Sequence, residues 1–164
     1  MVMLRKIVSG GQTGVDRAAL DVALELDIPC GGWCPKGRIA EDGRIPDRYP
    51  LVESPASAYE ERTEWNVRDS DGTLILATFP PTGGTAYTLY LIEQYGRPFT
   101  AVDLDRVSGD ENAFRMEAKR IAAWIEAEGI EVLNVAGPRE SKQPGITDLA
   151  TRLLRRMVTA VPEP

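Results

Sequence analysis

Two glycine-rich segments of the sequence could bind an anion. Residues 10–14 follow the apolar pair Ile7 and Val8 after one serine, and residues 82–85 follow the largely apolar run 73–78. Each segment stands between a predicted strand and a predicted helix, where backbone N–H groups without partners and the positive end of the helix dipole favour phosphate. We therefore predict a shared phosphate site with these candidate residues: Gly10, Gly11, Gln12, Thr13, Gly14, Thr82, Gly83, Gly84 and Thr85.

The glycine spacing narrows the class of ligand. Neither segment is a Walker A loop, because no Gly-Lys-Ser/Thr follows, and neither has the GxGxxG spacing of dinucleotide-binding proteins. Two structural alternatives stay open: the first segment is a tight turn that packs a strand against a helix, and the second is a well-capped helix start. The pattern therefore indicates phosphate binding without indicating an ATPase or a dinucleotide.

Basic side chains in two other loops could neutralise such a phosphate. Lys36 and Arg38 lie in the long segment 33–46, and Arg139 and Lys142 follow the last predicted strand. Guanidinium and ammonium groups bind phosphate or carboxylate, and long loops inside compact domains are usually functional or disordered. The alternative for Lys36 and Arg38 is a solvated surface loop whose charges pair with their neighbours. We take Lys36, Arg38 and Arg139 as candidate phosphate ligands.

A polar stripe lies on the predicted second helix. Tyr59, Arg62, Thr63 and Asn66 stand at i, i+3, i+4 and i+7 and therefore share one helix face. Helices that cover a sheet usually bury an apolar stripe, so this one favours a ligand pocket or a polar subunit interface; the alternative is a face that points to solvent. In a pocket, Arg62 and Asn66 would contact the ring or the sugar of the ligand.

The chain contains no histidine and two cysteines. The missing histidine excludes Ser-His-Asp and Cys-His nucleophilic chemistry and any histidine-based metal site. Cys30 and Cys34 have neither the CxxC spacing of a redox pair nor a second pair to complete a zinc site, so we expect small buried side chains and no protein metal site. Catalysis would rest on carboxylates, with Asp16, Glu41 and Glu93 as candidates; capping of a helix is the alternative for Asp16.

Five strand–helix units are predicted to position these residues. The strands are expected at residues 7–8, 30–34, 73–78, 99–104 and 131–136, and the second helix at about 55–67 with Ser54 as its N-cap. The alternation is typical of α/β proteins and predicts a three-layer, Rossmann-like doubly wound parallel sheet with helices on both faces. A flavodoxin-like order 2-1-3-4-5 would place the strand reversal between strands 1 and 3, which precede the two glycine-rich segments.

Length and charge set further expectations. A chain of 164 residues is most simply one domain over residues 1–164, with an ordered core of about 3–159 and a frayed tail at 161–164. The net charge of −6 argues against nucleic acid or an anionic membrane as the main partner. No apolar run reaches the length of about 18 residues that a membrane span needs, and no secretory signal is evident, so we expect a cytoplasmic protein.

The motifs together resemble the molybdenum cofactor carrier family of bacterial Rossmann-like proteins, related to the nucleotide-binding lysine-decarboxylase-like (LOG) superfamily. The resemblance rests on Ser9-Gly-Gly-Gln-Thr-Gly-Val-Asp-Arg-Ala-Ala-Leu-Asp21, on Pro35-Lys-Gly-Arg38 with Ala40-Glu-Asp-Gly43, on Gly83-Gly-Thr85, and on Asn134-Val-Ala-Gly-Pro-Arg-Glu-Ser141. It implies a Rossmann-like fold, a nucleotide-like ligand and a homodimer or homotetramer.

The resemblance and the residues together leave three hypotheses. The first is a non-catalytic carrier of a phosphorylated pterin or nucleotide-like ligand, with molybdenum cofactor as a candidate whose own dithiolene would hold the metal. The second is a nucleotide-processing enzyme such as a nucleoside-monophosphate phosphoribohydrolase. Related hydrolases carry a PGGxGTxxE-like motif; residues 81–85 are shorter and Glu93 lies further along, which favours binding. The third is an oligomeric scaffold whose glycines only pack.

Overall fold

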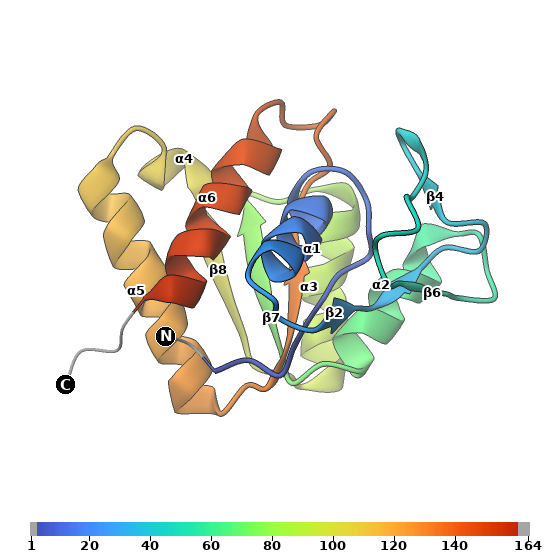
Figure 1. Cartoon of the computed structure of the whole chain (residues 1–164), viewed down its shortest axis with the longest axis horizontal. Helices are drawn as coiled ribbons and strands as arrows, with labels where there is room; N and C mark the ends of the chain where they lie inside the picture. Colours follow the sequence, from blue (N-terminus) through green and yellow to red (C-terminus); the bar gives the residue numbers. More distant parts are fainter. Residues whose placement is uncertain (1–2, 161–164) are drawn as a thin grey trace.

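A central parallel sheet organises the chain in the computed structural model, which describes residues 3–160. Its strands are β1 (Lys6–Val8), β2 (Cys30–Gly31), β7 (Gly72–Ala77), β8 (Phe99–Asp103) and β9 (Val132–Ala136), in the order β2-β1-β9-β7-β8. All pairings within it are parallel, so the carboxyl ends of the strands meet at one edge of the sheet (Figure 1). The predicted parallel sheet is confirmed.

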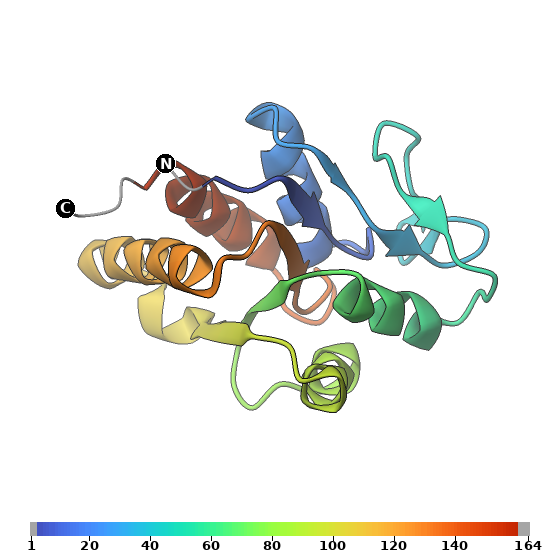
Figure 2. The ribbon, with the colours of Figure 1, turned by 90° about the horizontal axis from the view of Figure 1, so that it is seen from below.

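Helices cover both faces of this sheet (Figures 1 and 2). α1 (Val15–Glu25), α5 (Glu111–Glu128) and α6 (Ile146–Thr159) form one layer, and α2 (Tyr59–Arg68) and α3 (Gly83–Tyr95) form the other. The short helix α4 (Leu104–Val107) follows β8 directly. The three-layer, Rossmann-like doubly wound architecture predicted from the alternation of strands and helices is therefore confirmed.

Strand β7 shows how the sequence builds the two layers. Leu74 and Leu76 are fully buried in the core cluster shared with α1, α5 and α6, whereas Ile75 packs with Val67 of α2 and Leu91 of α3. Successive side chains of a strand point to opposite faces, so a run that is apolar at every position needs cover on both sides. The continuous apolar run thus requires the helices that the sequence supplies.

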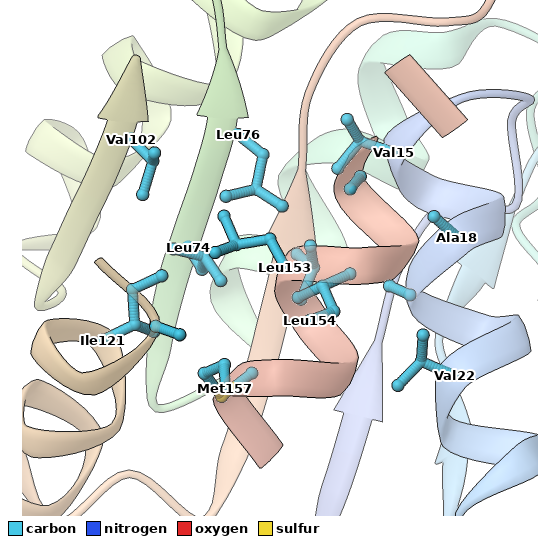
Figure 3. Packing of buried hydrophobic residues seen from close by; sticks show 14 of the residues in the cluster. Val15, Ala18, Val22, Leu74, Leu76, Val102, Ile121, Leu153, Leu154 and Met157 are labelled. Carbon is cyan, nitrogen blue, oxygen red and sulfur yellow. The ribbon is translucent and has the colours of Figure 1, made fainter. Parts of the chain in front are cut away.

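The larger core cluster packs α1 and α6 side by side against one face of the sheet (Figure 3). Its helical residues recur at three- and four-residue spacing, as an inward helix face requires. Leu154 of α6 is buried in the cluster, whereas Leu149 is only partly buried at its edge. The cluster members labelled in Figure 3 are Val15, Ala18, Val22, Leu74, Leu76, Val102, Ile121, Leu153, Leu154 and Met157.

The predicted strand order is wrong. Counted by strand–helix unit, the observed order is 2-1-5-3-4, because β9 inserts between β1 and β7 and pairs with both. Burial explains the placement: Leu133 and Val135 of β9 are buried, as a central strand requires, whereas Phe99 at the start of the edge strand β8 is half exposed. The loop after β9 therefore stands between the two glycine-rich segments.

The second helix starts later than predicted. Ser54 is not its N-cap: the Ser54 N–H donates to the Cys34 carbonyl at 2.8 Å, and the Lys36 N–H donates to the Ala56 carbonyl at 2.9 Å. These bonds extend the parallel pairing of β3 (Trp33–Cys34) with β6 (Val52–Glu53). The backbone before residue 57 is therefore held in an extended ladder, and the helix begins at Tyr59.

The segment between β3 and β6, expected as a long loop, contains a short hairpin of β4 (Ile39–Ala40) and β5 (Gly43–Arg44). Ile45 and Tyr49 are fully buried and anchor the segment, together with Leu20 of α1.

None of the helices within residues 3–160 is long and apolar enough to cross a membrane. The expected tail at 161–164 lies outside the described residues, and the single-domain assignment stays a prediction.

Gly137, at the start of the loop after β9, gives a direct test of the observed order. A methyl group there would collide with the Leu76 carbonyl oxygen and lie 2.6 Å from Cγ2 of Val15. We expect Gly137→Ala to lower the free energy of unfolding by about 1–3 kcal/mol, the usual range for an overpacked site, measured by urea denaturation. Gly84→Ala is the matched control, because a methyl group at Gly84 meets nothing within 4 Å; equal stability of the two variants would contradict the packing.

Candidate functional site

A cavity of about 400 Å³ opens at the carboxyl edge of the sheet, beyond β1, β9 and β7. This is the edge at which parallel α/β sheets bind ligands. Four parts of the chain line it: the first glycine-rich turn with the start of α1, α2, the segment after β7 with the first turns of α3, and the end of β9 with the loop that follows it. The lining includes Gly10, Gln12, Asp16, Tyr59, Arg62, Thr63, Asn66, Thr78, Thr82, Gly84, Thr85, Thr88, Asn134, Arg139, Lys142 and Gln143.

The polar stripe of α2 faces this cavity. Tyr59, Arg62, Thr63 and Asn66 all line it, so the stripe does not point to solvent. The Asn66 side chain, however, is committed to Trp33: its oxygen accepts from the Trp33 N–H at 2.8 Å, and its nitrogen donates to the Trp33 carbonyl at 2.9 Å. Asn66 therefore holds α2 against β3, a role that the spacing of the stripe does not indicate.

A buried ion pair joins the stripe on α2 to the first turn of α1. Arg62 Nη1 is 3.0 Å from Asp16 Oδ2, with side-chain exposures of only 13% and 7%. Burial raises the pKa of the Asp16 carboxyl above its ordinary value, and the charge of Arg62 opposes that rise. Arg62 Nε is buried without a hydrogen-bond partner. Buried donors are nearly always paired, so this N–H stands out as a donor without a partner on a residue that lines the cavity.

The first glycine-rich turn packs against groups of the protein itself. A methyl group at Gly10 would collide with the Arg62 guanidinium, and one at Gly11 would lie 2.5 Å from Cδ1 of Leu51. Gly14 has φ 81°, and a side chain there would collide with the Pro138 carbonyl, which already accepts the Val15 N–H at 3.2 Å. Close packing thus accounts for Gly11 and Gly14, and the first N–H of α1 is used within the protein.

The second glycine-rich segment is open by comparison. Its N-cap residue, Thr82, makes no side-chain cap, and Thr82, Gly84 and Thr85 line the cavity. The Lys142 ammonium lies so near Gly83 that an added methyl group would come within 2.8 Å of Nζ. Within residues 3–160, that ammonium makes no hydrogen bond or ion pair. A positive helix end and a cation side by side favour an anion between them.

Arg139 adds a second cation to the same side of the cavity. It lines the cavity, its Nε is buried without a hydrogen-bond partner, and the same atom lies 3.4 Å from Oε2 of Glu41. Burial alone would raise the pKa of the Glu41 carboxyl, but hydrogen bonds from Ser141 and Thr13 hold it below its usual range. Glu41 itself does not line the cavity.

Lys36 and Arg38 are not brought to the cavity. The Arg38 guanidinium is buried and donates to the carbonyls of Ile45, Pro46, Tyr49 and Leu51 at 2.8–3.2 Å, although its backbone has φ 55°. Its donors stabilise the segment 45–51. Arg38, predicted as a phosphate ligand, therefore has a structural role in holding this segment. The exposed Lys36 lies beyond the cavity lining.

The three carboxylates considered for catalysis are separated. Asp16 lines the cavity, but neither Glu41 nor the exposed Glu93 near the end of α3 does so.

Cys34 is buried and Cys30 half-buried, and both are free thiols. Across the described part of the chain, no group of three His, Cys, Asp or Glu side chains could hold a metal ion.

Several polar residues of the cavity were not among the candidates drawn from the sequence: Thr78, Thr88, Asn134 and Gln143. Asn134 is buried in β9, and its side chain donates to Thr73 Oγ1 at 3.3 Å; Thr78 donates to Oε1 of Gln143 at 2.9 Å. Asn134 had a usable signal, because it is the polar residue inside an otherwise apolar strand. Thr78 stands directly after β7, where ligand-binding residues of such sheets concentrate.

Comparison with known proteins gives two matches of high coverage. A model of the circularly permutated YpsA SLOG family matches residues 7–158. A crystal structure from Syntrophus aciditrophicus, named "putative molybdenum carrier protein", has 48% sequence identity and a TM-score of 0.91, and the match covers 96% of this chain and 97% of that one. None of the curated proteins compared with the chain matches it.

The role of Arg38 can be tested by a conservative substitution. A lysine cannot reproduce the planar fork that reaches four carbonyls. We expect Arg38→Lys to lower the free energy of unfolding by about 2–3 kcal/mol, the scale of hydrogen bonds to a charged group. Lys36→Arg, at an exposed neighbouring position, is the control and should be neutral in urea denaturation. If Arg38→Lys were as stable as the wild type, the stabilising role of the Arg38 guanidinium would be contradicted.

A second ion pair predicts a pH dependence. Hydrogen bonds from Arg17 to Asp42, at 3.0 and 3.1 Å, lower the pKa of the Asp42 carboxyl. A lowered folded-state pKa stabilises the protein above the unfolded pKa of about 3.9, and this contribution is lost as the pH falls through the folded value. Asp42→Asn should cost at most about 1 kcal/mol at pH 6, and this cost should shrink as the pH falls below about 4. A difference in urea denaturation that does not shrink below about pH 4 would refute this.

Proposed function

The chain belongs to the circularly permutated YpsA SLOG family, and from this membership we propose that it binds and carries a small phosphorylated ligand. The observation that carries the proposal is the cavity side formed by Arg139, Lys142 and the uncapped start of α3. The relative from Syntrophus aciditrophicus, by its name, supports a carrier role. The ligand class we propose is a phosphorylated pterin or nucleotide-like compound.

The charge of the lining supports an anionic ligand. Arg62, Arg139 and Lys142 line the cavity together with one carboxylate, Asp16, in a chain whose net charge is −6. Cations that line one cavity repel one another, and an anion bound there relieves this repulsion because phosphate oxygens accept from both guanidinium and ammonium donors. We propose that the phosphate lies at the start of α3, on the N–H groups of Gly84 and Thr85.

Other residues of the lining suit the rest of the ligand. Tyr59, Thr63 and Asn134 offer an aromatic ring and hydrogen-bonding groups there, and the volume lies within the range of small-ligand sites. Molybdenum cofactor fits this donor set, since Lys142 and Arg139 would hold its phosphate and Arg62 Nε would donate to its polar atoms. When bound, the cofactor supplies molybdenum already ligated by its own dithiolene.

Binding has more support than hydrolysis of a nucleotide. A glycosidic bond breaks through an oxocarbenium-like transition state that needs a carboxylate beside the sugar. Asp16 is the candidate at the cavity, and its carboxylate is held by Arg62, whereas Glu41 and Glu93 lie outside. We therefore propose a protein without catalytic activity. Its assembly as a homodimer or homotetramer stays a prediction, which light scattering of the purified protein would test.

The proposal predicts a ligand that survives gentle purification. Native mass spectrometry should show an adduct with the mass of a pterin or nucleotide monophosphate, and elemental analysis should find phosphorus, with molybdenum if the cofactor is bound. Incubation with AMP should release no free adenine. A protein that carries no adduct, and that no phosphorylated compound stabilises, would instead support the scaffold hypothesis, because a ligand at 100 times its Kd adds about 2.7 kcal/mol.

Two lysine substitutions, made one at a time, test whether the phosphate binds in the cavity or in the segment 33–46, where the sequence analysis placed candidate phosphate ligands. We expect Lys142→Ala to weaken AMP binding by about tenfold, since one charge-assisted hydrogen bond to phosphate is lost. Lys36→Ala removes the same charge from an exposed position outside the cavity and should leave the Kd unchanged. Isothermal titration calorimetry measures both. The reverse result would move the phosphate to the segment 33–46.

A further inference from the structure

Glu41, at the tip of the β4–β5 hairpin, joins three segments that are distant in the sequence. Its carboxylate accepts from the Thr13 hydroxyl in the first glycine-rich turn. The same carboxylate accepts from the N–H of Ser141 at 3.1 Å and from the Ser141 hydroxyl, both in the loop after β9. Its backbone N–H donates to Oε1 of Gln12 at 2.9 Å. The residue is therefore held by both its backbone and its side chain.

The bonds around Glu41 continue into the loop that carries Arg139. Thr13 Oγ1 accepts from the Glu140 N–H at 3.2 Å while its hydroxyl donates to Glu41. Glu140 in turn accepts from the Gly145 N–H at 3.0 Å and so fixes the far end of the loop to the start of α6. Arg139 thus stands in a loop that is tied on both sides, with the Glu41 carboxylate 3.4 Å from its Nε.

We propose that Glu41 is a positioning residue that fixes the Arg139 guanidinium at the cavity. This inference rests on the proposed function, in which Arg139 binds the anion. Glu41 does not line the cavity, so it acts through Arg139 and not on the ligand. Its separation from Arg139 is that of an ion pair without a hydrogen bond to Nε, which leaves the donors of the guanidinium for the ligand.

The opposite role is that Glu41 competes with the ligand for Arg139 and must leave when an anion binds. The two roles predict opposite signs: loss of the carboxylate charge weakens anion binding if Glu41 positions Arg139, and strengthens it if Glu41 competes. The bonds that the carboxylate accepts from Thr13 and Ser141 favour positioning, because a carboxylate with three donors is not readily displaced. The bond from the Glu41 N–H to Gln12 also holds its backbone in place.

The first test needs no ligand. In ¹⁵N-correlated NMR spectra of the whole protein, the Nε–Hε signal of Arg139, assigned by its loss in Arg139→Ala, should shift and exchange faster with water in Glu41→Gln. Asp47→Asn is the matched control, since it removes one carboxylate charge from the same segment at an exposed position away from Arg139. An Arg139 signal that is the same in wild type and Glu41→Gln would overturn the positioning role.

The second test is a double-mutant cycle with AMP as the probe. We expect Glu41→Gln and Arg139→Ala each to raise the Kd by about tenfold, and the double variant to bind no more weakly than Arg139→Ala alone. Additive losses, or tighter binding by Glu41→Gln, would overturn positioning while the proposed function stands. Equal affinity of wild type and Arg139→Ala would instead overturn the anion site, and the NMR result would still decide whether Glu41 orients Arg139.

Discussion

The arrangement of the site depends on one place where the backbone after β9 packs tightly against its neighbours, at Gly137. Because β9 inserts between β1 and β7, the chain leaves it at Gly137 with no room for a side chain, between the Leu76 carbonyl and Val15. The next carbonyl, that of Pro138, accepts the first N–H of α1. This passage brings Arg139 and Lys142 to the centre of the carboxyl edge, so two of the three cations that line the cavity come from the loop after β9.

The same passage changes what the first glycine-rich turn can do. Its glycines make room for Arg62, Leu51 and Pro138, and Asp16 places a carboxylate in the first turn of α1. An external phosphate at that helix end would compete with groups that the protein already supplies. The start of α3 has no such internal anion, and Lys142 adds a positive charge beside it. Charge and packing therefore both direct the ligand to α3.

The sequence analysis predicted correctly the features that depend on local patterns. It was wrong about features that depend on contacts between segments far apart in the chain. Alternation of strands and helices sufficed for the three-layer fold, and the spacing of Tyr59, Arg62 and Thr63 sufficed for the face that lines the cavity. Strand order depends on which apolar runs become central, which periodicity does not encode. Arg38 looked like a phosphate ligand because its carbonyl partners at 45–51 are made by tertiary folding. Asn66 was expected to contact the ligand, but its side chain bonds to Trp33, which is 33 residues away in the sequence.

A crystal structure of the protein with AMP would test the central claim, that the cavity binds phosphate at the start of α3 and not on the first glycine-rich turn. We expect the phosphate within hydrogen-bond distance of the N–H groups of Gly84 and Thr85, with the Lys142 ammonium and the Arg139 guanidinium as further partners. A phosphate seated on residues 10–14, or on Lys36 and Arg38, would contradict the account.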